Sequence, residues 1–194
     1  MPKKVTKKII PSRKKAKGYG KSAAAKAKHI KLLIVDVDGV MTDGSIILDN
    51  EGNEFKRFNV RDGHGIKLLI RHGIEVAIIT GRQSKVVSLR AKELGIKHVY
   101  QKCWNKMVPY EDLKSKLSVS ENEIAYIGDD VVDISLLKRA GLAVAVSDAH
   151  KDVLEFVDVI TEEEGGKCAV RSVCDFILQS KGIWKDIIDG YIDA

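Results

Sequence analysis

The chain has 194 residues, with 33 Lys and Arg against 27 Asp and Glu, for a formal net charge of +6 and a pI near 9.1. This length suits one domain with its own core and is too short for two enzymatic domains. The sequence contains no apolar run near the roughly 20 residues that a membrane span requires. Its three cysteines, too few and too oddly numbered for a disulfide framework, indicate a reducing compartment. We therefore expect a soluble, cytoplasmic protein with no membrane partner.

The basic charge is concentrated at the N-terminus. Residues 1–29 contain 11 of the 33 Lys and Arg residues and no acid, which leaves 22 basic and 27 acidic side chains elsewhere. This segment offers little apolar surface to offset the entropy of ordering, so we expect a disordered tail. A solvated appendage is the plainest interpretation, and an arm for nucleic acid or an anionic surface and an organelle transit peptide are the alternatives. For the acidic remainder we expect no nucleic-acid partner.

From residue 31 onward, short apolar runs alternate with helical patterns. Residues 32–35 form a continuous apolar run, which is typical of a strand buried on both faces. Similar runs follow at 76–79, 98–100, 124–127, 142–146 and 157–160. Helical patterns occupy 64–72, 84–94, 106–117, 131–140, 150–155 and 167–180. This alternation indicates a parallel sheet with helices on both faces.

One pair of runs breaks the alternation. Residues 45–48 and 54–58, joined by a polar turn, indicate a β-hairpin. The predicted fold class is therefore α/β, a doubly wound, Rossmann-like parallel sheet that carries one projecting hairpin. We assign the domain to residues 30–182, between the basic tail at 1–29 and a C-terminal tail at 183–194.

Polar residues follow the predicted strands at their carboxyl ends, where open α/β sheets bind ligands. Asp36 and Asp38 follow the first strand, and Thr80, Gly81 and Arg82 follow the second. Lys106 opens the helix after the third strand. The fourth strand leads into Asp129 and Asp130, with Asp133 slightly further along.

Carboxylates gathered at one point repel each other, so a hard divalent cation such as Mg²⁺ is expected between them, with Asp36 and Asp129 as ligands. Residues i and i+2 of an extended segment face the same way, so Asp36 can attack a substrate while Asp38 handles a proton. Thr80 offers its hydroxyl and backbone N–H to phosphoryl oxygens, and Lys106 offers a positive charge. Each signal is weak alone, but together and in this order they indicate phosphoryl transfer.

These residues resemble the four motifs of the haloacid dehalogenase superfamily of phosphohydrolases. The run DVDGV at 36–40 looks like the first motif, Thr80 the second, Lys106 the third and the run GDD at 128–130 the fourth. The resemblance implies that Asp36 becomes an aspartyl-phosphate, while Asp38 protonates the leaving oxygen and then activates water. It also implies that Mg²⁺ is held by Asp36, the main-chain carbonyl of Asp38, and Asp129.

Many members of that superfamily carry a separate cap domain. Here only 41 residues separate Asp38 from Thr80 and 25 separate Thr80 from Lys106, so neither interval holds one. Over about residues 30–182 the chain is similar to the capless family of 3-deoxy-D-manno-octulosonate 8-phosphate phosphatases. The matching stretches are 36–44 (DVDGVMTDG), 58–66 (FNVRDGHGI), 75–82 (EVAIITGR), 125–130 (AYIGDD) and 165–174 (GGKCAVRSVC).

This resemblance implies an acidic sugar phosphate as substrate and a product used in lipopolysaccharide sugar synthesis. It also implies a homotetramer in which a neighbour's hairpin and C-terminal tail help to enclose the site. Arg82 suits the substrate carboxylate, which a guanidinium grips with two hydrogen bonds. His64 is a candidate sugar contact, with a plain polar residue near a helix start as the alternative. The run at 165–166 is either a plain turn or a flexible closing loop, and Lys167-Cys168 departs from the Arg-Gly pair common in the family.

Three alternatives remain open. One is a phosphatase of nine-carbon sialic-type sugar 9-phosphates, in which we expect Glu at the position of Arg82. Another is a catalytically silent module for oligomerisation or regulation. This alternative is disfavoured because the chain keeps all four motif residues, namely Asp36, Asp38, Lys106 and Asp129. The third is a phosphatase of nucleic-acid ends that binds through residues 1–29.

Overall fold

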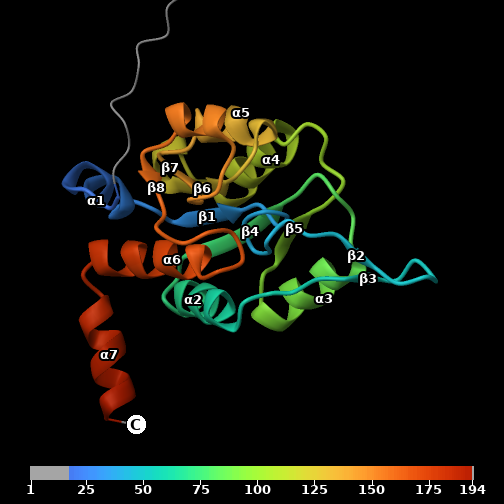
Figure 1. Ribbon diagram of the computed structural model, residues 1–194. Coiled ribbons are helices and arrows are strands. Elements are labelled where there is room, and N and C mark those ends of the chain that lie inside the picture. Colours follow the sequence, from blue (N-terminus) through green and yellow to red (C-terminus); the bar gives the residue numbers. More distant parts are fainter. Residues whose placement is uncertain (1–17, 194) are drawn as a thin grey trace, which may run out of the picture.

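A central parallel sheet with helices on both faces organises residues 18–193, which the computed structural model describes (Figure 1). The sheet has six strands in the order β5-β4-β1-β6-β7-β8, all parallel. Their bounds are β1 Leu32–Val35, β4 Glu75–Ile79, β5 His98–Tyr100, β6 Ile124–Gly128, β7 Leu142–Ala145 and β8 Val159–Ile160. The strand order reverses beside β1, and the predicted doubly wound α/β fold is confirmed.

The central strand β1 joins two hydrophobic cores because its side chains alternate between the faces of the sheet. Leu33 and Val35 pack into the core on one face of the sheet, whereas Leu32 and Ile34 pack into the core on the other face. All four side chains are fully buried. The continuous apolar run therefore reflects a strand covered on both sides.

The helices begin and end close to the predicted positions. Asn59 accepts a hydrogen bond from the N–H of Arg61, and this cap starts α2 four residues before the predicted helix. The segment predicted as one helix over 131–140 is instead a 3₁₀ turn followed by a short α-helix. The bounds are α2 Val60–Arg71, α3 Lys85–Leu94, α4 Met107–Leu117, α5 Ile134–Leu137, α6 Ala169–Ser180 and α7 Trp184–Ile192, with 3₁₀ turns at Glu121–Glu123, Val131–Asp133 and Lys151–Phe156. No helix within residues 18–193 has the length and apolar character to cross a membrane.

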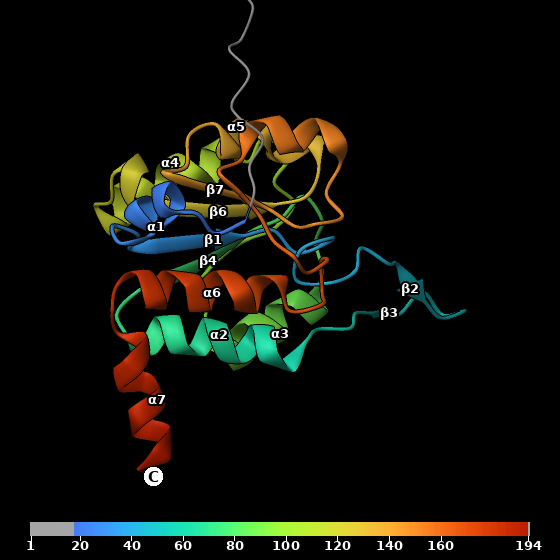
Figure 2. The same cartoon turned by 60° about the vertical axis from the view of Figure 1, so that its left-hand side comes forward.

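The predicted hairpin is present and projects from the domain (Figure 2). Its strands β2 Ile47–Leu48 and β3 Glu54–Phe55 are short and pair antiparallel. Apolar side chains along it are exposed, namely Ile46, Ile47, Leu48 and Phe55.

Both chain ends differ from expectation. The prediction of disorder over residues 1–29 is wrong for helix α1, Lys21–Ala27, which buries Ala23 and Ala27 and packs against α6. Two alanines one helical turn apart allow this close packing, although they supply little apolar area. Residues 1–17 lie outside the described residues, as does most of the basic charge of the tail. At the other end, helix α7 extends from α6, and its Trp184 packs against the core.

Candidate active site

Three of the acidic residues predicted at the strand ends come together at one edge of the sheet. Strands β1 and β6 are hydrogen-bonded neighbours, so Asp36 and Asp129 emerge side by side. Oxygens of Asp36, Asp129 and Asp133 all lie within 4.8 Å of one another. The ammonium of Lys106 lies 2.9 Å from Oδ2 of Asp36 and 2.6 Å from Oδ1 of Asp133. Four residues from three separate segments of the chain thus form one cluster.

Asp133 anchors this cluster, and both of its oxygens are already bonded. Its Oδ1 accepts hydrogen bonds from Lys106 and from the hydroxyl of Tyr126 at 2.5 Å. Its Oδ2 accepts from the main-chain N–H of Asp129 at 2.9 Å and of Asp130 at 3.3 Å. Asp133 therefore fixes the loop after β6 and has little capacity left for a ligand.

Asp36 and Asp129 are the carboxylates that remain available. Oδ1 of Asp36 is buried and has no hydrogen-bond partner within the described chain. A buried, unpaired carboxylate oxygen is costly, and a hard cation between Asp36 and Asp129 would satisfy it. The donor set, two carboxylates with open oxygens beside an anchored third, therefore fits Mg²⁺.

The charges of the cluster also favour a bound cation. Burial, together with the nearby charges of Asp36 and Asp133, raises the pKa of Asp129 to about 8. Burial also raises the pKa of Asp36, although the Lys106 charge opposes this. Burial alone would lower the pKa of Lys106, but its two acidic partners outweigh that effect and raise it. One lysine cannot neutralise three acids, so the cluster retains an excess of carboxylates.

A close approach of the backbone shapes the first loop. Gly39 has a φ of +91°, and a Cβ at this position would lie 2.2 Å from Oδ2 of Asp129. The loop at 165–166 packs on the same turn, since the N–H of Gly166 donates to the carbonyl of Val40 at 2.9 Å. A Cβ on Gly165 would meet the Gly39 carbonyl oxygen at 1.9 Å. The glycine pair thus allows two loops to lie against each other next to Asp129.

Asp38 lies outside the trio of carboxylates and faces the base of the hairpin. Its Oδ1 contacts the ammonium of Lys56, and its Oδ2 lies 3.8 Å from Nε of Arg82. Glu54 contacts both cations, at 3.4 Å from Lys56 and 3.1 Å from Arg82. We call Asp38, Lys56, Glu54 and Arg82 the hairpin-base ring. Sequence reasoning missed Lys56 and Glu54, because charged residues on a hairpin strand give no signal of their contacts.

Thr80 lies at the end of β4, next to β1, as predicted. Its N–H donates to the carbonyl of Tyr100 at 2.9 Å, so the expectation that this N–H binds a phosphoryl oxygen is wrong. Its side chain is buried, and the hydroxyl is the group that remains for substrate. Gly81 leaves open space where a side chain would stand.

His64 lies elsewhere. It belongs to α2, and its Nε2 is 3.3 Å from the hydroxyl of Tyr191 on α7. Its neighbours, among them Tyr191, Arg171 and Asp175, lie outside the acidic cluster, so its role as a sugar contact stays a prediction.

Comparison with known proteins assigns this arrangement to a family. Residues 98–166 match the haloacid dehalogenase-like hydrolase family. Over 167 residues the chain is 48% identical to the 3-deoxy-D-manno-octulosonate 8-phosphate phosphatase of Escherichia coli strain K12, covering 84% of this chain and 89% of that protein. The chain belongs to this phosphatase family of haloacid dehalogenase-like hydrolases. The resemblance seen in the motifs is confirmed.

Solved structures of the family have the same fold. The phosphatase from Yersinia pestis aligns with a TM-score of 0.84 at 47% identity, covering 85% of this chain and 89% of that one. The phosphatase from Moraxella catarrhalis, crystallised with a magnesium ion, a phosphate ion and a KDO molecule, aligns with a TM-score of 0.85 at 42% identity, covering 87% and 97%.

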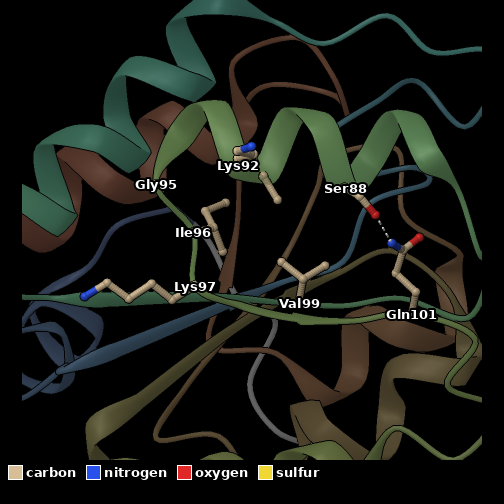
Figure 3. A pocket seen from close by; sticks show the side chains of 8 residues that line it. Ser88, Lys92, Gly95, Ile96, Lys97, Val99 and Gln101 are labelled. Carbon is tan, nitrogen blue, oxygen red and sulfur yellow. Dashed lines mark hydrogen bonds between the residues drawn. The ribbon is translucent and has the colours of Figure 1, made fainter.

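One groove of this family member lies apart from the acidic cluster. Figure 3 shows it between α3 and the edge strand β5. Its volume is about 460 Å³. Ser88 and Gln101 close one end through a 2.7 Å hydrogen bond between their side chains. Its lining contains no carboxylate and none of the strand-end residues, so it is separate from the phosphatase site.

Proposed function

We propose that the chain is a Mg²⁺-dependent phosphatase that converts 3-deoxy-D-manno-octulosonate 8-phosphate to the free sugar acid and phosphate. The observation that carries this is the cluster of Asp36, Asp129 and Asp133 around Lys106, in a chain 48% identical to a phosphatase of that name. The related Moraxella catarrhalis structure, which holds a magnesium ion, a phosphate ion and KDO, supports the choice of metal and sugar.

Asp36 is the nucleophile of this reaction. One of its oxygens forms a bond to phosphorus, while the bond from phosphorus to the sugar oxygen breaks and leaves its electron pair on that oxygen. Asp38 donates a proton to the leaving oxygen and then accepts a proton from the water that attacks the aspartyl-phosphate. Phosphate is released, and Asp36 returns to its carboxylate form.

Other residues hold the charge that the reaction handles. Lys106 keeps Oδ2 of Asp36 in place at 2.9 Å, and the hydroxyl of Thr80 remains to donate to a phosphoryl oxygen. Mg²⁺, held by Asp36, Asp129 and the main-chain carbonyl of Asp38, would neutralise negative charge on the phosphoryl group. Asp133 positions Lys106 and the loop that carries Asp129.

Arg82 is our candidate for the sugar carboxylate. Its side chain is 44% exposed, and its Nη2 contacts a carboxylate oxygen of Glu54 at 3.1 Å. A guanidinium that already pairs with one carboxylate at the surface is suited to exchange it for another.

We also propose a cytoplasmic homotetramer. The three cysteines are all free thiols, which suits the reducing cytoplasm. The exposed apolar side chains of the hairpin suit a contact with a second copy of the chain, because apolar surface gathered on one projection marks interaction sites.

The decisive experiment measures phosphate release from a panel of sugar phosphates, with Mg²⁺ and with excess EDTA. We expect hydrolysis of the eight-carbon acidic 8-phosphate, loss of activity in EDTA, and no measurable turnover by Asp36→Asn. Asp152→Asn, a change at an exposed aspartate on a 3₁₀ turn, is the matched control and should keep full activity.

Each other outcome changes the proposal in a defined way. Faster hydrolysis of a nine-carbon 9-phosphate would move the chain to the sialic-type substrate. If no acidic sugar phosphate releases phosphate, the chain is a silent module and the proposed function is wrong.

A further inference from the structure

A buried lysine links the hairpin to the first catalytic loop. Lys56 follows strand β3, and its side chain is only 1% exposed although it belongs to the projecting hairpin segment. Its ammonium contacts Oδ1 of Asp38 and lies 3.4 Å from Oε1 of Glu54. A lysine side chain is rarely this buried without a specific partner. Here the partners are two carboxylates, one of which ends the DVD run.

Lys56 is the principal support of Asp38. Among residues 18–193, Lys56 is the only donor that makes a hydrogen bond to the Asp38 carboxylate, because Arg82 remains 3.8 Å away. Asp38 is partly exposed at 21%, so without Lys56 its carboxylate is free to change rotamer. The hairpin-base ring alternates two anions with two cations, so Glu54 and Arg82 fix Lys56 in turn.

We propose that Lys56 is a positioning residue for Asp38, which holds the carboxylate where it can pass a proton to the leaving oxygen. This inference rests on the proposed function and adds a residue to it. In the step concerned, the phosphorus–oxygen bond to the sugar breaks, its electron pair stays on the sugar oxygen, and the proton of Asp38 moves to that oxygen. Proton transfer requires the donor within hydrogen-bond reach of its acceptor, so a displaced Asp38 slows this step.

The contacts favour positioning over direct binding of substrate. The ammonium of Lys56 is buried and already faces two carboxylates, whereas Lys106 lies beside the nucleophile. A role in positioning also explains why Lys56 lies at the hairpin: movement of the hairpin base would carry Lys56 with it and alter the placement of Asp38.

The test compares two phosphate esters that differ in their need for a proton. An alkyl phosphate such as the sugar 8-phosphate has a leaving oxygen that must be protonated, whereas p-nitrophenolate leaves without a proton. The rate measured is that of release of the leaving group, the sugar or p-nitrophenolate, in a single turnover with enzyme in excess over ester. This rate reports the first half-reaction and not the later attack of water. The variants are Lys56→Met, the conservative Lys56→Arg, and Arg57→Met as the matched control on the next residue, where only an exposed ion pair to Asp43 is lost.

For Lys56→Met we expect the single-turnover rate with the sugar phosphate to fall roughly 10²-fold, the size of a typical general-acid contribution. The rate with p-nitrophenyl phosphate should stay close to that of the wild type, and KM for the sugar phosphate should change little. Lys56→Arg should recover most of the lost rate, and Arg57→Met should match the wild type with both esters.

Two results would overturn the inference. An equal loss with both esters means that Lys56 supports the fold or the phosphoryl group in general. A raised KM at unchanged kcat means that Lys56 binds substrate directly. In either case a wild-type enzyme that cleaves the sugar phosphate leaves the proposed function standing, whereas a wild-type chain inactive on both esters defeats the function itself.

Discussion

Lys106 illustrates how one residue can serve both fold and site. Its side chain is nearly fully buried between Asp36 and Asp133, both also buried, and its ammonium lies within 3.3 Å of the Tyr126 hydroxyl. A buried ion pair contributes little net stability, because desolvation offsets the attraction between its members. Removing one partner is different, because the remaining charge is left buried without compensation.

Lys106→Met is therefore expected to lower both stability and activity. Loss of the ammonium leaves Asp36 and Asp133 uncompensated, and we expect the free energy of unfolding to fall by about 3–5 kcal/mol. Phosphate release should fall with it, since Oδ2 of Asp36 loses its partner. Urea unfolding in EDTA and a phosphate assay in Mg²⁺ measure the two effects, with exposed Lys97→Met as control. An unfolding free energy equal to that of the control would contradict this account.

At the scale of elements, the contact between α2 and α6 holds one face of the domain together (Figure 2). Gly65 allows the two helices to approach closely, because a Cβ there would lie 3.0 Å from Cβ of Cys174. Asp62, also on α2, accepts a hydrogen bond at 2.7 Å from the N–H of Arg171 near the start of α6. Its other oxygen is buried and unpaired among the described residues. Within the matching stretch 58–66, Asp62 and Gly65 thus serve to pack two helices.

Asp62 should make stability depend on pH. Burial raises its pKa from 3.8 to about 6, against the opposing effect of the Arg171 N–H. Above pH 6 the folded protein holds a buried charge, which destabilises it. As the pH falls from 6 to 3.8 the folded state binds a proton that the unfolded state does not, so this penalty disappears.

Asp62→Asn removes that titration. We expect the wild type to gain stability relative to this variant as the pH falls from 7 to 4, by about 3 kcal/mol at most. Urea unfolding across this range measures the difference, with exposed Asp186→Asn as control. A difference that is constant with pH, or that grows in the opposite direction, would show that Asp62 does not titrate in this way.

For the whole molecule, the sequence predicted what depends on local pattern. Apolar runs marked the six strands, and because strands β1, β4 and β6 are neighbours, the polar residues after them converge as expected. Contacts between segments distant in the sequence could not be predicted from such patterns. Lys56 reaches Asp38 because the chain after β3 returns to the first loop, and α1 packs against α6 through its alanines. The composition of residues 1–29 predicted disorder because composition gives no information about a neighbouring surface against which a segment can pack.

The hairpin carries apolar side chains that the single chain leaves exposed. Ile46 and Leu48 are exposed at 59% and 58%, on a projection too small to bury them itself. If a second copy covers them, as we propose, light scattering of the wild type should give four times the 21.4 kDa of one chain. The double variant Ile46→Asp with Leu48→Asp should give a smaller mass and a lower rate of phosphate release, because charge at an apolar contact is costly to bury.

Leu89→Asp on α3, where the side chain is equally exposed at 59%, is the matched control and should keep the wild-type mass. A monomeric wild type would rule out the homotetramer and leave the catalytic proposal untouched, since the acidic cluster and the hairpin-base ring each form within one chain. A smaller assembly that keeps full activity would separate the two roles of the hairpin. The apolar residues would then serve assembly alone, and Lys56 at its base would be the part that serves the reaction.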